Sequence, residues 1–385
     1  MDESLVFNLI DHFIDLEDPR LDRTKRHLVI DIIAITVLAT ISGMHNWIEI
    51  VDWAKGNEKW LKTILKLPGG VPSHDTFGRV FSLINPDAFQ NAFMMWVDSI
   101  KLNFPNREII AIDGKSLRGS TFNKKDLTCT SVSIISAWAC KSGLTLAQIS
   151  THLKKNEGEK KTMEKILDQI DVHGNIITID ANGATPTIMN KIAAKGGDCV
   201  VGLKGNQLKA NQLAIDLFSN LEIQINVKQV VNEDSGHGRE EKRTFELLAL
   251  KDIKVGTFKN EIEKFKNKWP SITSLGRVVS EVFKGAEYSA HERYFLTSLS
   301  DVKEFAESSR AHWGVENSLH WQMDVTFRED YCRVRIGHAA ANLGLIRRLA
   351  LNLLKKEVKS KKSIRRKQLL CNFDKNYLLE IITGI

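Results

Sequence analysis

One short apolar run limits what this chain can fold into more than any other stretch. Residues 109–112 are three isoleucines and one alanine, and Asp113, Gly114 and Lys115 follow them directly. A run of about four to eight apolar residues that is closed by a turn signal is typical of a buried strand. We therefore expect Asp113 at the carboxyl end of a strand, where the open sheets of α/β proteins bind their ligands.

A second run repeats this design, because Ile176–Ile179 leads into Asp180. Between the two runs the pattern predicts two further strands and a helix, and after them a helix and a strand. The predicted elements are strands at 109–113, 130–139, 144–149, 176–180 and 198–203, with helices at 161–170 and 186–195. This β-β-β-α-β-α-β order is that of an RNase H-like α/β core. In that topology the first and fourth strands are neighbours, which would bring Asp113 and Asp180 together.

A third carboxylate, Glu316, lies in a stretch with helical character. Cleavage of a phosphodiester needs charge stabilisation on the attacking and leaving oxygens, and two divalent ions held by carboxylates provide it. Magnesium prefers oxygen ligands and keeps several of its waters, so a few carboxylates are enough to hold it. Asp113, Asp180 and Glu316 are therefore the candidate catalytic and metal-binding residues, for Mg²⁺ with Mn²⁺ as a substitute. For a single aspartate followed by glycine, an ordinary turn is the competing interpretation.

The rest of the chain divides around this core. Residues 1–105 read as helices, including one predicted at 47–66 and one that begins after Ser73 as its N-cap. Residues 106–385 would form the catalytic domain, interrupted at about 208–300 by a β-rich insertion. We expect short strands in this insertion at 223–231, 243–250, 275–283 and 293–299. Helices return at 301–323 and again from residue 339.

Several polar residues could contact DNA phosphates, although each could also be ordinary surface chemistry. These candidates follow the predicted strands, lie in a glycine-flanked loop or precede Glu316: Lys115, Arg118, Lys204, Asn206, His237, Arg239 and Arg310. His312 and His320 flank Glu316 at four-residue spacing, and one of them is expected to support Glu316. Trp313 and Trp321 are interpreted as core residues.

The net charge of +7 is unevenly distributed. Ten Lys and Arg residues and one Glu lie between Arg347 and Lys367, a local charge of +9. A basic tail at about 347–367 suits a polyanion such as DNA, although a solvated lysine-rich surface is as common. The five scattered cysteines fit a reducing cytoplasm without disulfides. We expect no signal peptide, because no basic segment followed by an apolar run stands at the N-terminus. We expect no membrane span, because the most apolar window is short and carries Asp31.

These residues resemble the H-repeat-associated, ISAs-type branch of bacterial insertion-sequence DDE transposases. The matching motifs run from 70–77 through 111–115, 179–181, 196–198, 203–207 and 237–239 to 312–321 and 324–330. The resemblance implies an RNase H-like catalytic domain in which Asp113, Asp180 and Glu316 form the DDE triad. It also implies cleavage at element ends, joining of the freed 3′ hydroxyl to target DNA, and a possible homodimer on paired double-stranded ends.

The sequence departs from that family's pattern after Asp180, where Asn182-Gly183-Ala184-Thr185 stands. The departure leaves a second hypothesis open, that the chain is an inactive remnant that binds DNA without cutting it. A third is an RNase H-like nuclease without strand transfer. An active transposase would be a cytoplasmic protein that is associated with the nucleoid when bound to DNA.

Overall fold

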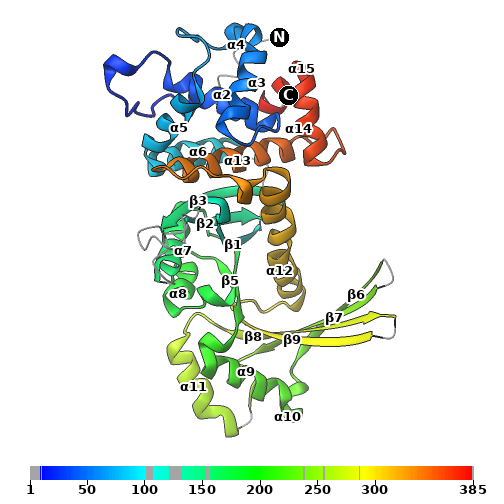
Figure 1. Ribbon diagram of the computed structural model, residues 1–385. Coiled ribbons are helices and arrows are strands. Elements are labelled where there is room, and N and C mark those ends of the chain that lie inside the picture. The colour runs from blue at the N-terminus through cyan, green and yellow to red at the C-terminus, as the bar shows by residue number, and fades with distance from the viewer. Residues whose placement is uncertain are drawn as a thin grey trace, which may run out of the picture.

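The computed structural model describes residue 9 and residues 11–100, 107–120, 132–152, 157–236, 239–254, 256–285 and 287–383. Its elements lie in three tiers (Figure 1): helices from both ends of the chain, then the middle of a nine-stranded sheet with its flanking helices, then an extension of that sheet with further helices. A mixed α/β fold is confirmed. The predicted domain boundary near residue 105 lies outside the described residues.

Five strands form the middle of the sheet, in the order β3-β2-β1-β4-β5. They are β1 (Ile109–Ser116), β2 (Val132–Ala139), β3 (Leu144–His152), β4 (Ile176–Ile179) and β5 (Asp198–Leu203). β1, β2 and β3 pair antiparallel, whereas β4 is parallel to β1 and β5 is parallel to β4. Ile112 pairs with Ile179, so the residues that follow, Asp113 and Asp180, lie side by side as expected.

β1 is longer than the sequence pattern predicts, and this corrects the position of Asp113. The strand continues to Ser116, which pairs with Ser133 of β2, so Asp113 lies within the strand and not at its end. β2 runs antiparallel beside it, and Gly114 and Lys115 pair with Ile135 and Ile134 of that strand. Long-range pairing therefore overrides the local Asp-Gly turn signal.

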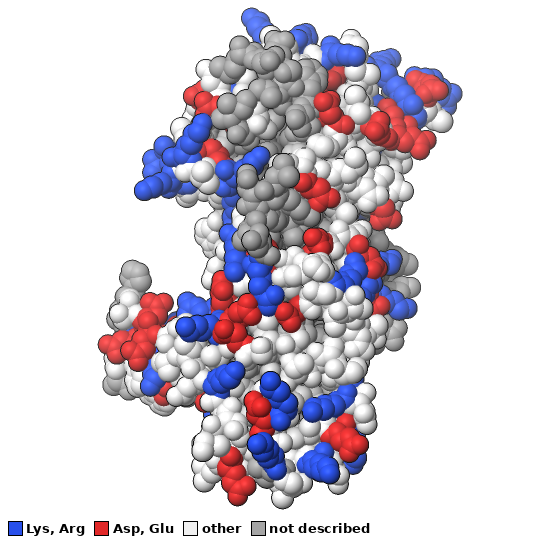
Figure 2. Space-filling model, turned by 180° about the vertical axis from the view of Figure 1, so that it is seen from behind, with Lys and Arg blue, Asp and Glu red and all other residues white. Residues whose placement is uncertain are grey.

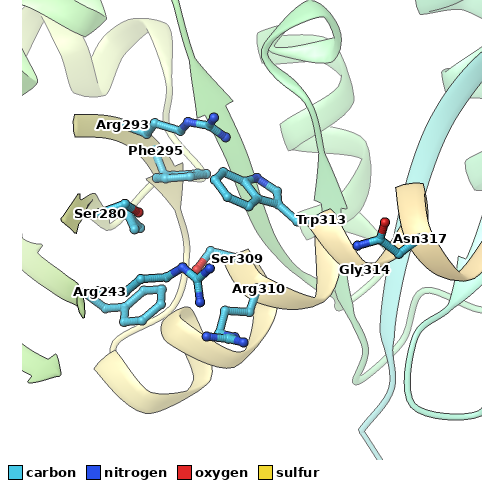
Figure 3. Close-up of a pocket in the computed structure, with 11 residues that line it drawn as sticks. Arg243, Ser280, Arg293, Phe295, Ser309, Arg310, Trp313, Gly314 and Asn317 are labelled. Atoms are coloured by element: carbon cyan, nitrogen blue, oxygen red, sulfur yellow. The ribbon is translucent and has the colours of Figure 1, made fainter. Parts of the chain in front are cut away.

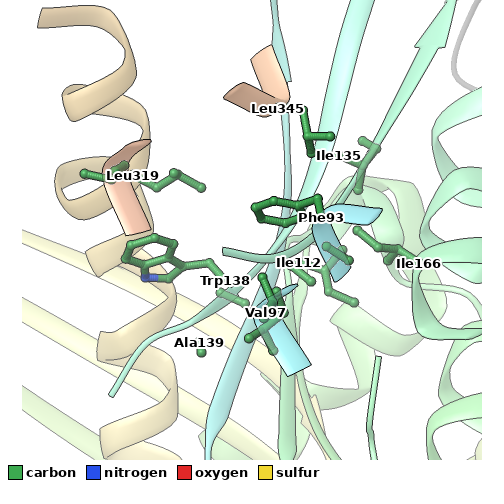
Figure 4. Close-up of a cluster of buried hydrophobic side chains, with 14 of the residues drawn as sticks. Phe93, Val97, Ile112, Ile135, Trp138, Ala139, Ile166, Leu319 and Leu345 are labelled. Carbon is green, nitrogen blue, oxygen red and sulfur yellow. The ribbon is translucent and has the colours of Figure 1, made fainter. Parts of the chain in front are cut away.

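Both faces of the central strands are covered, which explains their almost continuous apolar sequences. On one side lie α7 (Glu157–Gln169), which contacts β2 and β3, and α8 (Pro186–Ala194), which contacts β5. On the other side α12 (Val302–Val315) contacts β1, β4 and β5. Figure 1 shows the sheet between these helices. Figure 4 shows Phe93, Ile112 and Ile135 among the apolar side chains of the core that joins the sheet to the first tier.

The insertion extends the same sheet and does not form a separate one. It begins with α9 (Leu208–Ser219) and α10 (Leu221–Gln224), and α11 (Lys259–Lys268) separates its two hairpins. The hairpins are β6 (Lys228–Gly236) with β7 (Arg239–Ala249) and β8 (Ser274–Lys284) with β9 (Glu287–Thr297). β9 pairs antiparallel with β5, which places the order β9-β8-β7-β6 beyond β5.

Two expectations for the insertion are wrong. The strand expected from residue 223 begins at Lys228, because Asn220 caps a helix over Leu221–Gln224 and Ile223 is buried beneath it. The strands are also longer than predicted, since β7, β8 and β9 each contain 11 residues. The outer part of β9 is exposed on both faces, so no hydrophobic alternation marks it in the sequence.

The helices of the N-terminal region are η1 (Asp22–Thr24), α2 (Val29–Ile41), α3 (Trp47–Gly56), α4 (Glu58–Ile64), α5 (His74–Leu83) and α6 (Pro86–Ile100). The Ser73 side chain accepts a hydrogen bond from the Thr76 amide, which confirms it as the N-cap of α5. The single helix predicted over 47–66 is instead two helices. The chain breaks at Asn57, whose side-chain amide donates to the Trp53 carbonyl at 2.7 Å.

The basic run does not form a free tail. Most of it lies in α13 (Ala339–Lys356) and α14 (Ile364–Phe373), which with α15 (Lys375–Thr383) pack on the N-terminal helices. Arg347, Arg348 and Lys367 are buried. On the described part of the face in Figure 2, Lys and Arg are mixed with Asp and Glu and do not form one broad basic surface. No helix of the described residues is long and apolar enough to cross a membrane.

Candidate active site

Asp113, Asp180 and Glu316 line one cavity of about 640 Å³. Its walls come from β1, β4, β5, β9 and α12, and the basic residues Lys204 and Arg293 also line it. The three carboxylates are far apart in the sequence, and the parallel pairing of β1 with β4 and the packing of α12 across these strands bring them together. With Glu292, four carboxylates and two cations therefore line this cavity.

Local backbone structure fixes the two aspartates. The Asp113 carboxylate accepts a hydrogen bond from the Gly114 amide at 2.8 Å. Asp180 caps the short helix η4 (Ala181–Gly183), where its carboxylate accepts from the Asn182 amide at 3.0 Å. A methyl group on Gly183 would overlap Ile179 and Met163, so glycine is required for this turn to lie against the core.

Glu316 stands where α12 changes its geometry. The regular helix ends at Val315, and two π-helical segments follow, Glu316–His320 and Gln322–Thr326. Wide turns of this kind are rare and occur frequently at functional sites. The buried side chains of Leu319 and Met323 keep these turns against the core while Glu316 faces the cavity.

The carboxylates repel one another. Burial, together with the negative charges of Asp180 and Glu316, raises the pKa of Asp113 to about 7. Glu159, in the first turn of α7, adds to this effect, and burial and Asp180 raise its own pKa. Glu159 was not among the residues that the sequence indicated. A glutamate in the first turn of a helix is ordinarily explained by the helix dipole, so nothing in the sequence distinguishes it.

The two histidines near Glu316 contact other residues than expected. The His312 Nδ1 lies 3.0 Å from the Thr178 hydroxyl, and the His320 Nδ1 lies 3.6 Å from the Asp113 carboxylate. Burial lowers the pKa of His312, and burial with the nearby Arg348 and Lys115 lowers that of His320 to about 4. Both rings are therefore neutral near pH 7, and His320 lies beside Asp113 where we expected a partner of Glu316.

The donor atoms suit a divalent cation in kind. Carboxylate oxygens are the protein ligands that Mg²⁺ and Mn²⁺ prefer, and burial together with the neighbouring carboxylates disfavours the ionised form of Asp113. Within the described residues, however, no three His, Cys, Asp or Glu side chains converge closely enough to enclose an ion. In this part of the chain the residues therefore fit a divalent cation in the kind of their donor atoms and do not form a closed site for it.

Lys115 is not exposed at the cavity as the DNA-contact hypothesis requires. It is buried, and its ammonium lies 2.6 Å from Asp324, 3.1 Å from Asp330 and 3.5 Å from Glu329. Three carboxylates thus surround this cation, and they raise its pKa although burial opposes them. The pairing connects β1 to the segment after α12, and the sequence alone did not reveal it.

The other expected DNA-contact residues lie in different places. Lys204 lines the acidic cavity and Arg310 is exposed on α12. Arg118 is exposed beside Asp330, and Arg239 is exposed at the tip of the β6–β7 hairpin. The Asn206 side chain donates to the Ala181 carbonyl at 2.6 Å, so it holds the turn after Asp180. His237 lies outside the described residues.

The tryptophans of the segment around Glu316 are not core residues. Trp313 is 39% exposed and Trp321 is 50% exposed. The Arg293 guanidinium lies over the Trp313 ring at 3.9 Å from its centroid, and both side chains line the acidic cavity. The apolar character of tryptophan predicted burial, but a neighbouring arginine from β9 covers one face of Trp313 in place of the core.

The chain belongs to the DDE transposase family. Residues 105–353 match the family model of the transposase DDE domain, and residues 10–97 match the DDE_Tnp_1-associated model. The match confirms the resemblance found in the motifs, and the triad positions fall within the matched DDE domain.

Curated relatives agree over nearly the whole length. The chain is 32% identical to the "H repeat-associated putative transposase YhhI" of Escherichia coli K12, with 98% of each chain covered. It is 33% identical to the "Putative transposase YncI" of Escherichia coli O157:H7, with 98% of this chain and 95% of the relative covered. A solved piggyBac transposase synaptic complex with hairpin DNA aligns with this chain at 9% identity and a TM-score of 0.39. The alignment covers 100% of this chain and 81% of that one, and the similarity is distant.

Proposed function

We propose that this chain is an active DNA transposase of a bacterial insertion sequence. It would cleave phosphodiester bonds at the element ends and transfer the freed strand to target DNA. The observation that carries this proposal is the meeting of Asp113, Asp180 and Glu316 at one cavity of a chain that belongs to the DDE family. The strand order β3-β2-β1-β4-β5, with its antiparallel and parallel pairs, supports an RNase H-like core at residues 106–385.

Asp113, Asp180 and Glu316 would hold Mg²⁺, with Mn²⁺ as a substitute. Such ions, when bound, activate the attacking oxygen and stabilise the charge on the leaving oxygen. Because burial and neighbouring carboxylates raise the pKa of Asp113 to about 7, cation binding near pH 7 would release a proton from this carboxyl group. The neutral His320 ring would orient Asp113 without adding positive charge.

Double-stranded DNA is the proposed partner. Lys204 at the cavity and the exposed Arg118, Arg239 and Arg310 would contact its phosphates, since backbone contacts position a protein on a duplex. Lys115 and Asn206 are left out of this set because their side chains are engaged within the protein.

We also propose that the protein forms a homodimer on paired DNA ends. Its chain would consist of an N-terminal domain of residues 1–105 and a catalytic domain of residues 106–385, and the catalytic domain would contain the insertion at about 208–300. The protein would act in the cytoplasm and be nucleoid-associated while bound.

Two observations favour a second candidate function, an inactive remnant that binds element ends. Within the described residues the carboxylates do not already form a closed metal site. The segment after Asp180, with Asn182 exposed, also departs from the pattern implied by the family resemblance. DNA binding without cleavage would distinguish this remnant from the active enzyme.

The test is cleavage of an end-labelled duplex that carries the element's own terminus, with Mg²⁺ or Mn²⁺ present. Wild-type protein is compared with Asp180→Asn and Glu316→Gln, and Glu307→Gln on the same helix is the matched control because it lies outside the cavity. We expect metal-dependent nicking that both cavity variants lose by at least a hundredfold while they still bind DNA. Cleavage that persists in Asp180→Asn and Glu316→Gln would refute the proposed triad, and binding without cleavage by the wild type would favour the remnant.

A further inference from the structure

A second cavity lies beside the acidic one, between α12 and the sheet extension. Its volume is about 220 Å³, and residues from β7, β8, β9 and the α12 region line it. Arg293, Phe295, Ser309 and Trp313 belong to the walls of both cavities. A ligand in this second cavity would therefore lie next to whatever occupies the acidic site.

Three arginines from three different elements line this cavity: Arg243 of β7, Arg293 of β9 and Arg310 of α12. Figure 3 shows Arg293 over the Trp313 ring and Arg243 reaching from its strand toward the helix beside Ser309. Positive charges that line one cavity favour an anion inside it. We call Arg243, Arg293 and Arg310 the arginine triad.

The protein itself balances only part of this charge. Arg243 forms an ion pair with Glu241 at 2.5 Å, yet its buried Nε has no hydrogen-bond partner among the described residues. Within the same part of the chain, no carboxylate oxygen lies within 4.0 Å of the guanidinium of Arg293 or of Arg310. An unpaired buried donor is costly, so an anion at this position would stabilise the cavity.

We propose that the arginine triad binds a phosphate group of the DNA strand that continues from the phosphate at Asp113, Asp180 and Glu316. The proposal rests on the proposed function and adds a second contact point for the same strand. Guanidinium groups match phosphate geometry with paired N–H donors, which makes arginine suited to this contact. Trp313 forms the wall between the two sites, so its ring would set the path of the strand from one to the other.

The test measures binding of a short fluorescent duplex with the element's end by the full chain, over a range of salt concentrations. Arg243→Gln and Arg310→Gln are compared with wild type and with Lys259→Gln, which removes the same charge from the exposed surface of α11. Each arginine variant is expected to weaken binding roughly tenfold. Each should also reduce the slope of log affinity against log salt by about one. Urea midpoints of the variants check that they are folded.

A methylphosphonate scan identifies the phosphate. Replacing one charged phosphate at a time should weaken wild-type binding at the position that the arginine triad contacts. The same replacement should not weaken the binding of Arg310→Gln any further. The proposal is overturned if both arginine variants keep the wild-type affinity and salt slope. It is also overturned if the loss of affinity from Arg310→Gln and the loss from the uncharged phosphate add at every position of the scan. A wild-type protein that binds no duplex at low salt would overturn it as well.

The two proposals fail in different ways. If wild-type protein cleaves the labelled end and the arginine variants bind and cleave as it does, the arginine triad is not a phosphate site while the transposase function stands. If wild-type protein binds but does not cleave, and the variants lose affinity and salt dependence, the phosphate site stands while the proposed catalysis fails.

Discussion

The guanidinium of Arg348 donates a hydrogen bond to the Glu329 carboxylate at 2.8 Å, and neither side chain is exposed to solvent. Arg348 comes from α13 and Glu329 from the segment after α12, so the pair joins α13 to the segment that follows Glu316. Glu329 also lies 3.5 Å from the Lys115 ammonium of β1. This buried ionic cluster holds together α13, the segment after Glu316 and β1, the strand that carries Asp113.

Breaking the pair from one side should destabilise the protein strongly. We expect Arg348→Met to lower the free energy of unfolding by about 3–5 kcal/mol, because the Glu329 charge would remain buried without its main partner. Arg118→Gln is the matched control, since Arg118 is 85% exposed and its ion pair with Asp330 is a surface one. The control should change stability by less than about 1 kcal/mol. Urea denaturation measures both, and equal small effects would contradict a stabilising role for the cluster.

Acid should weaken the same cluster. Arg348, Arg347 and Lys115 lower the pKa of Glu329 to about 2 although burial opposes them, against an ordinary value of 4.5. A lowered carboxyl pKa gives stability that is fully present above about pH 4.5 and is lost as the pH falls toward 2, by roughly 3 kcal/mol. Urea midpoints between these pH values should fall more steeply for wild type than for Glu329→Gln. Parallel curves would show that Glu329 does not cause the loss.

Divalent cations should stabilise the acidic cavity. The raised pKa of Asp113 means that its ionised form opposes folding increasingly as the pH rises from about 4 to 7. Mg²⁺ at ten times the dissociation constant that it has at pH 7 should stabilise wild type by about 1.4 kcal/mol at that pH, which is a rise of roughly 2 °C in melting temperature. The same Mg²⁺ concentration should stabilise the protein more above pH 7 and less below it.

Asp180→Asn tests whether charge repulsion in the cavity lowers the melting temperature and whether Mg²⁺ relieves it. Removing this carboxylate relieves repulsion, so the variant should melt higher than wild type without metal and gain little when Mg²⁺ is added. Glu307→Gln, outside the cavity, should respond to Mg²⁺ as wild type does. An unchanged Mg²⁺ response in Asp180→Asn would argue against metal binding at this residue.

The position of α12 depends on one glycine of the sheet. A methyl group at Gly276 of β8 would overlap the ring of Phe305, which is fully buried on α12. We expect Gly276→Ala to destabilise the protein by about 1–3 kcal/mol and to shift the helix that carries Glu316, reducing cleavage. Gly56→Ala is the control, because nothing lies within 4 Å of the added carbon. A stability loss equal in both variants would refute this packing role.

Much of the central sheet follows from local pattern. The strand Asp198–Leu203 lies where its apolar run predicts it, and β4 ends at Ile179, directly before Asp180. The side chains of these strands are apolar because both sheet faces are covered, and such continuous apolar runs can be recognised in the sequence. The insertion was harder to predict, because the exposed outer parts of β6–β9 carry polar residues on both faces.

The sequence by itself determined the chemical groups of the candidate site and the family, since the motifs around Asp113, Asp180 and Glu316 are short contiguous stretches of residues. Only the tertiary structure decided what each neighbouring cation does. Lys115 stands two residues from Asp113, but its ammonium is surrounded by carboxylates from 324–330, whereas Arg243 and Arg293 come from the distant insertion to meet Arg310. Charge interactions depend on distance and burial in space, and these are fixed by packing between segments that the order of residues does not place together.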